Sequence, residues 1–103
     1  MAKNEVIMLL QSYIQLLRAE GISVDKAFLY GSYLSNSAST ESDIDLMIVT
    51  DNDDDDYLVG KIWKLTRKVN SKIEPFLVGK DRFYGDDNSP LVDLVKRTGL
   101  EII

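Results

Sequence analysis

Two amino acids that carry much of enzyme chemistry are missing from this sequence, which contains no cysteine and no histidine. Without cysteine there is no disulfide framework, no thiolate zinc site and no thiol nucleophile. Without histidine the commonest general base and transition-metal ligand is also absent. Catalysis by this chain must therefore depend on carboxylates, hydroxyls, lysines and arginines, and we expect any catalytic metal to be an oxygen-binding ion such as Mg²⁺.

Positive charge and long apolar runs are also scarce. The chain has 12 Lys and Arg against 17 Asp and Glu, a net charge of −5. Binding a phosphate backbone needs the opposite sign, so free nucleic acid is not an expected partner. No apolar run approaches the roughly 20 residues that span a bilayer, and the chain begins with an amphipathic segment instead of a signal core. We therefore expect a cytoplasmic protein with a single domain over residues 1–103.

Helical spacing of apolar residues predicts three helices. The first contains Val6 to Leu17 and ends before Gly21, a suitable C-terminal cap. The second covers about 54–69, with acids at its start and bases towards its end, as the helix dipole favours. The third begins at Ser89-Pro90 and stops at Gly99.

Short apolar runs predict strands at 26–30, 44–49 and 72–78. Pro75 cannot donate a ladder hydrogen bond, so the last strand is expected at a sheet edge or irregular after Glu74. The four terminal residues form either a short strand or a packed tail. The order of elements indicates an α/β or α+β fold with a small mixed sheet packed against helices, and it leaves the topology open.

Two short motifs indicate chemistry when they are considered together. Asp43 and Asp45 flank one residue at the start of a strand, which places two carboxylates on one face, about 6.6 Å apart along the backbone. Such like charges repel, and a divalent cation between them removes that penalty. Gly31-Ser32 follows the preceding strand, where glycine permits close backbone approach and the next amide and hydroxyl can donate to phosphate oxygens. Taken alone, each motif is more often structural: Asp43 would cap a turn with Asp45 facing water, and Gly31-Ser32 would be a plain turn with a capping serine.

The two motifs stand ten residues apart, as Gly-Ser-x10-Asp-x-Asp between hydrophobic strands. This arrangement resembles the polymerase-β-type nucleotidyltransferase superfamily, and within it the stand-alone minimal nucleotidyltransferases that are often paired with HEPN-domain proteins. The stretches at 28–33 and 42–49 are similar to the signature of that family. The tail from Asn88 to Ile103 is similar to the way these short chains end.

The resemblance implies a nucleotidyltransferase fold and a role for each site residue. Asp43 and Asp45 would bridge two Mg²⁺ ions, and Glu74, in the position of the family's third carboxylate, would complete the metal site and help to deprotonate the acceptor. Gly31 and Ser32 would hold the phosphates of the nucleotide. Ser42 is a further candidate for the phosphate-binding role.

The same resemblance implies the reaction and the partner: transfer of AMP from ATP, or of a nucleotide from another NTP, to a side chain of a HEPN-type toxin. A homo-oligomer is also compatible with it. No motif selects the cation that assists the triphosphate among Lys61, Lys64, Lys68 and Arg82.

Two other interpretations remain open at this stage. The chain could be an antitoxin that keeps the fold and covers its partner without turnover, or an acidic structural domain without a ligand. The acidic run at 51–56 does not indicate an EF-hand, because such a loop would need glycine at position 56 and glutamate at position 62, where the chain has Asp56 and Ile62.

Overall fold

The computed structural model describes residues 1–51, 53–85 and 89–103. Asn52 of the acidic run and Asn88 at the start of the family-like tail lie outside these ranges. The elements follow one another as α1 (Lys3–Ala19), β1 (Lys26–Tyr30), β2 (Ile44–Thr50), α2 (Asp56–Thr66), β3 (Ile73–Gly79), α3 (Lys80–Tyr84), α4 (Pro90–Thr98) and β4 (Leu100–Glu101).

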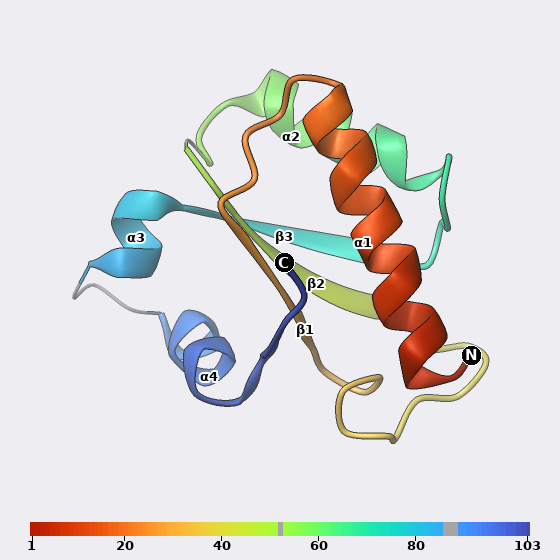
Figure 1. Cartoon of the computed structure of the whole chain (residues 1–103). Helices are drawn as coiled ribbons and strands as arrows, with labels where there is room; N and C mark the ends of the chain where they lie inside the picture. The colour runs from red at the N-terminus through yellow and green to blue at the C-terminus, as the bar shows by residue number, and fades with distance from the viewer. Residues whose placement is uncertain (52, 86–88) are drawn as a thin grey trace.

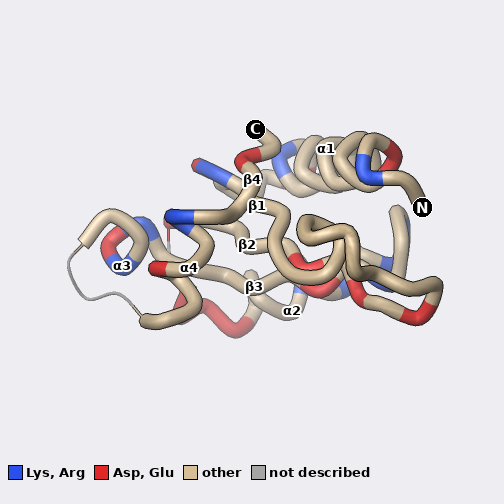
Figure 2. Tube along the Cα trace, turned by 90° about the horizontal axis from the view of Figure 1, so that it is seen from below, with Lys and Arg blue, Asp and Glu red and all other residues tan. Residues whose placement is uncertain are grey.

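The four strands form one mixed sheet in the order β3-β2-β1-β4. Strand β2 pairs antiparallel with β1 and parallel with β3, and β4 pairs antiparallel with β1. Figure 1 shows α2 connecting the two parallel strands and α1 crossing the sheet. Seen along the strands, the sheet separates α1 on one side from α3 and α4 on the other (Figure 2). The predicted mixed sheet packed against helices is therefore confirmed.

The larger hydrophobic cluster lies between the sheet and helices α1 and α2. It includes Leu10 and Ile14 from α1, Ile62 from α2, and Leu29 and Leu46 from the sheet, all fully buried. At roughly 1.5–3 kcal/mol for each fully buried aliphatic side chain, this cluster contributes most of the hydrophobic stabilisation. Helix α1 buries one face in this cluster, as the helical spacing of its apolar residues predicts.

A smaller cluster fills the opposite face of the sheet, beneath α3 and α4. Phe28 and Phe83 stack here with ring centroids 5.5 Å apart, beside Met47, Val78 and Val95. Helix α3 was not predicted from the sequence, because five residues are too short for an apolar period to be recognised. It nevertheless supplies Phe83, the aromatic centre of this cluster.

The predicted helix ends are confirmed where capping residues define them. Gly21 has φ +83°, its N–H donates to the carbonyl of Arg18, and the N–H of Ile22 donates to that of Leu17, the Schellman arrangement. Ser89 caps α4 and Gly99 ends it. Helix α2 is shorter than predicted, because Asp55 caps its start and residues 67–69 turn with tighter i→i+3 bonds.

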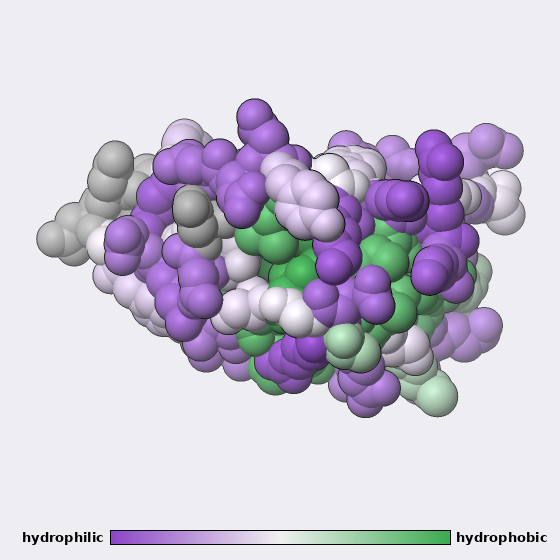
Figure 3. Space-filling view, turned by 90° about the horizontal axis from the view of Figure 1, so that it is seen from above, coloured by the Kyte–Doolittle hydropathy of each residue, from purple (hydrophilic) through white to green (hydrophobic). Residues whose placement is uncertain are grey.

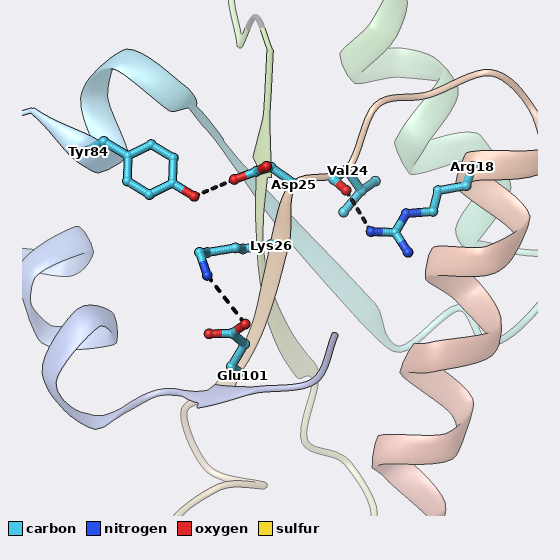
Figure 4. Close-up of polar contacts among 6 residues, drawn as sticks. All are labelled: Arg18, Val24, Asp25, Lys26, Tyr84 and Glu101. Carbon is cyan, nitrogen blue, oxygen red and sulfur yellow. Dashed lines mark hydrogen bonds and ion pairs between the residues drawn. The ribbon is translucent and has the colours of Figure 1, made fainter.

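Polar contacts fasten the beginning of β1 to three neighbouring elements, α1, α3 and β4 (Figure 4). The contacts are Arg18 to the Val24 carbonyl at 2.8 Å, Tyr84 to Asp25, and Lys26 to Glu101 at 3.4 Å. The hydrogen bond to Asp25 raises the pKa of Tyr84 to about 12. These contacts fix the strand that leads into Gly31. None of the helices in the described ranges has the length and apolar composition of a membrane span.

Strand β3 is an edge strand, as Pro75 predicts. Residues of a parallel strand direct their backbone groups alternately towards and away from the neighbouring strand. Since Pro75 lacks an N–H, it can face away from β2 without the loss of a ladder hydrogen bond. By the same alternation, the backbone groups of residues 73, 77 and 79 also face away from β2. The N–H of Ile73 donates to Asn70, and that of Gly79 donates to the carboxylate of Asp53.

Asp53 thus links the acidic loop to the end of β3 and to α3. Its carboxylate lies 2.8 Å from the guanidinium of Arg82, and its side chain is only 14% exposed. Burial works to raise the pKa of Asp53, but the Gly79 N–H and the Arg82 charge together outweigh it, and the pKa is lowered. Because the pKa of Asp53 is lowered in the folded chain, its carboxylate stabilises the fold at pH values above about 4, the ordinary pKa of an aspartate. This stabilisation is lost as the pH falls through the lowered pKa.

We expect Asp53→Asn to lower the free energy of unfolding at neutral pH by about 1 kcal/mol, a figure limited by the half-exposed Arg82 partner. The difference from the unmodified protein should shrink towards zero in acid. Urea unfolding at neutral and acidic pH measures it. Asp93→Asn removes a more exposed Asp–Arg pair within α4 and should change stability less. An equal or larger effect at Asp93 would contradict the assignment.

Candidate active site

The two acids that lie within strands are brought together by the register of the sheet. In the β2–β3 pairing Asp45 stands opposite Glu74, and in the β1–β2 pairing it stands opposite Tyr30. Neighbouring strands are about 4.8 Å apart. Asp45 points to the same face as Met47, two residues on, and so to the side of the sheet that carries α3 and α4. Residues far apart in the sequence therefore form one row across three strands.

Asp43 completes the acidic group from just before β2. Its side chain shares a hydrogen bond with Glu74, which is the first cause of the raised pKa of Glu74. Burial and the charges of Asp43 and Asp45 raise it further. For Asp45, burial is the main cause of a raised pKa and the charge of Asp43 adds to it. The group thus concentrates negative charge that the fold alone does not neutralise.

Gly31 lies against this group at the end of β1. Its φ is +79°, a left-handed conformation that side chains rarely adopt. A Cβ at this position would stand 2.1 Å from Oδ2 of Asp45, far inside contact distance. After Gly31 the chain makes a helical turn, in which the N–H groups of Leu34 and Ser35 donate to its carbonyl. Only glycine lets the chain turn beside the Asp45 carboxylate.

Comparisons with known proteins show the family to which the chain belongs. The sequence profile of the polymerase beta nucleotidyltransferase family matches residues 11–78, a span that includes Gly31, Asp45 and Glu74. The chain belongs to this family. No curated protein matches the sequence.

One solved structure with a similar fold is that of a candidate nucleotidyltransferase from Sulfolobus solfataricus. The likeness has a TM-score of 0.56 at 11% identity and covers 76% of this chain and 70% of the other. At so low an identity it supports the nucleotidyltransferase fold and carries no information on individual residues. The general prediction of a nucleotidyltransferase-type protein is confirmed by the family match.

The two serines predicted to hold phosphates occupy different places in this member of the nucleotidyltransferase family. Ser32 follows Gly31 in the turn, and its carbonyl accepts from the N–H of Ser37. Ser42 forms a local turn with Ser39, whose N–H donates to its hydroxyl at 2.9 Å. Ser32 therefore stands next to the glycine that contacts Asp45, whereas the hydroxyl of Ser42 is engaged within its own loop.

Two residues near the acids were missed by the sequence analysis. The pKa of Tyr30 is raised to about 12 by burial first and then by the charges of Asp45 and Glu74. Lys72 precedes β3, and its ammonium donates to the carbonyl of Thr40, which ties the loop after Gly31 to the start of that strand. Tyr30 stands immediately before Gly31 in the sequence, but only the strand register shows that it lies opposite Asp45.

Of the four cations considered for the triphosphate, two pair with acids outside the site. Lys61 donates to the carbonyl of Glu20 and lies 3.9 Å from its carboxylate, and Arg82 pairs with Asp53. Lys61, Lys64 and Lys68 belong to α2 and its C-terminal turn, across the sheet from the acids. The geometry does not select any of them.

The acids suit a hard divalent ion by their chemistry. Carboxylate oxygens are the preferred ligands of Mg²⁺ in proteins, and neighbouring carboxylate charge adds to the raised pKa of Asp45 and of Glu74 after burial and the hydrogen bond. As the side chains stand, however, no group of three or more acids in the described ranges forms a ready-made metal site. The hydrogen bond between Asp43 and Glu74 occupies two of the carboxylates with each other.

Proposed function

We propose that this protein is a Mg²⁺-dependent nucleotidyltransferase of the minimal kind, which moves AMP from ATP to an acceptor. The observation that carries the proposal is the pairing of Asp45 with Glu74 across β2 and β3, beside a glycine that leaves no room for a side chain. This row of carboxylates next to a turn is what the family's reaction needs, since nucleotidyl transfer requires charge placement and positioning and no nucleophilic side chain.

In this proposal Asp43, Asp45 and Glu74 hold two Mg²⁺ ions. The ions supply stabilisation of the charge that grows on the attacking and leaving oxygens. With the ions bound, Asp43 and Glu74 would both be ionised and the proton that they share would pass to solvent; Glu74 would then help to take the proton of the acceptor hydroxyl as pyrophosphate leaves. Ser32 donates to the phosphates from the turn after Gly31, and the positive φ of Gly31 directs that turn.

The acceptor and the setting of the reaction follow from the resemblance to minimal nucleotidyltransferases. We propose a single-domain cytoplasmic enzyme that adds AMP to a side chain of a HEPN-type toxin. The excess of acidic residues, 17 against 12, makes a protein acceptor more suitable than free nucleic acid. The acceptor rests on the family resemblance and the transfer on the site chemistry, so the two are tested separately.

The test is incubation of the protein with labelled ATP, Mg²⁺ and a HEPN-type toxin as acceptor. Transfer of label to the toxin, lost in Asp43→Asn and in Glu74→Gln, is the expected result. Label release from ATP without transfer to the toxin would support the enzyme and reject this acceptor. No turnover with any acceptor, together with no calorimetric signal for Mg·ATP, would reject the enzyme.

A second candidate function is a non-catalytic antitoxin that covers its partner. It is favoured by one observation: the acids of the described residues do not stand in a ready-made metal arrangement. The Asp43→Asn variant separates the two functions. If this variant still protects against the toxin, the protein acts by covering its partner without turnover. Protection lost together with label transfer would indicate the enzyme.

A further inference from the structure

Helix α2 presents an exposed face on the side of the sheet away from the candidate active site. Its core-facing residues Ile62, Leu65 and Thr66 are buried, whereas five others, together with Arg67 at the C-cap, are exposed. The exposed set recurs at intervals of three and four residues and so occupies one face of the helix. It comprises Asp56, Tyr57, Gly60, Trp63, Lys64 and Arg67.

This face, which we call the α2 face, contains two large aromatic side chains and a gap between them. Tyr57 is 78% exposed and Trp63 is 44% exposed. Gly60 lies between them, and a Cβ built at this position would meet nothing within 4 Å. Two surface grooves, of about 590 and 640 Å³, are both lined by Gly60, Lys64 and Arg67. The helix backbone can therefore be approached closely at its midpoint.

The charges of the α2 face are arranged symmetrically about Gly60. Asp56 lies four residues before it and Lys64 four residues after it, while Tyr57 and Trp63 lie three residues before and after. If two copies of the helix cross antiparallel at Gly60, each Asp56 lies level with the Lys64 of the other copy and each Tyr57 lies level with its Trp63, within reach of these long side chains. The helix dipoles are then also opposed, which is favourable.

We propose that the α2 face binds a second copy of this chain, in a two-fold symmetric dimer with the α2 helices antiparallel and Gly60 at the crossing. An isologous interface requires that the same patch be complementary to itself, and the Asp56–Lys64 arrangement meets this requirement. A nucleic acid would need a face of one positive sign, whereas the acidic residues at the start of α2 oppose it. Viewed from the end of the molecule at which α2 lies, much of the surface is hydrophilic, with hydrophobic side chains of other residues showing between the polar ones (Figure 3).

The size of the α2 face sets the expected affinity of the dimer. A helix of 11 residues is about 16 Å long, so the buried area falls in the small class of interfaces that form weak, concentration-dependent complexes. The net charge of −5 on each copy adds a general repulsion, which salt reduces. The dimer leaves Asp45 and Glu74 uncovered, because they lie on the opposite face of the sheet.

Sedimentation velocity over roughly a hundredfold range of protein concentration tests the proposal. The unmodified protein should associate, whereas Asp56→Lys and Lys64→Glu should each remain monomeric, because each variant faces its own copy with like charges. An equimolar mixture of the two variants should associate again, and so should the double variant. This pattern of loss and recovery is specific to an antiparallel pairing of positions 56 and 64.

Matched variants control for charge alone. Glu5→Lys reverses an exposed acid in the first turn of α1, and Arg97→Glu reverses an exposed base in the last turn of α4. Both should associate as the unmodified protein does. Gly60→Gln should raise the melting temperature, since glutamine favours a helix and has open space here, and should abolish association. A monomer at all concentrations, or a mixture that stays monomeric, overturns the proposal.

Discussion

Replacement of Asp45 by asparagine is expected to abolish most nucleotidyl transfer and at the same time to stabilise the fold. Loss of one charged group that acts on the transition state costs about 10³-fold in rate. Asp45 lies partly buried beside Asp43, and both features raise its pKa, which shows that the charged form is disfavoured in the folded chain. Removing that charge should raise the free energy of unfolding by up to about 1 kcal/mol after allowance for solvent screening.

Label transfer and urea unfolding, measured on the same preparation, check both parts of this result. Glu41→Gln is the matched control, since it removes an exposed acid from the loop before β2 without touching the acidic row. It should leave transfer and stability nearly unchanged. Undiminished transfer by Asp45→Asn would show that the row does not carry the reaction. A large loss of stability would show instead that Asp45 holds the strands together.

Replacement of Gly31 by alanine is expected to damage stability and activity together. The left-handed backbone at φ +79° costs a side chain about 1–2 kcal/mol. In addition, the new Cβ would stand 2.1 Å from Oδ2 of Asp45, so the carboxylate or the strand must move. Because an ångström of displacement at a reacting centre costs about 100-fold in rate, transfer should fall by at least that factor.

Gly21 provides a control with the same backbone and an open environment. Its φ is +83°, and a Cβ there would meet nothing within 4 Å. Gly21→Ala should therefore show the backbone penalty alone, with transfer per folded molecule unchanged. The difference between the two variants, in unfolding free energy and in rate, measures the collision at Asp45. Equal effects at the two glycines would remove the reason for assigning Gly31 to the site.

Much of the fold was predictable because local signals agreed with the tertiary structure. Gly21, Ser89 and Gly99 occupy the cap positions that their chemistry suggests, and Pro75 correctly indicated an edge strand. Helix α3 was missed because five residues contain no period to detect. The end of α2 was predicted too late, because the apolar spacing continues through Val69 while the backbone has already changed to a tighter turn.

The candidate site was predictable as a set of residues but not as a geometry. The spacing of Gly31 and Asp45 matched the signature of the family, and the structure adds that a Cβ built at Gly31 would collide with the Asp45 carboxylate. The opposition of Asp45 and Glu74 depends on a strand register that only the packing of β2 against β3 decides. Tyr30 and Lys72 were missed for the same reason, since nothing in their local sequence reveals which strand ends they adjoin.

The outer edge of β3 has a consequence for how the protein behaves at high concentration. Of its four outward positions, Pro75 has no N–H, and the N–H groups of Ile73 and Gly79 are already bonded, so Leu77 alone can offer a donor to an added strand. A single donor cannot template the repeated backbone pairing on which fibrils grow. The outer edge of β3 therefore does not support repeated strand addition. At high concentration the protein should remain dispersed or associate through side chains.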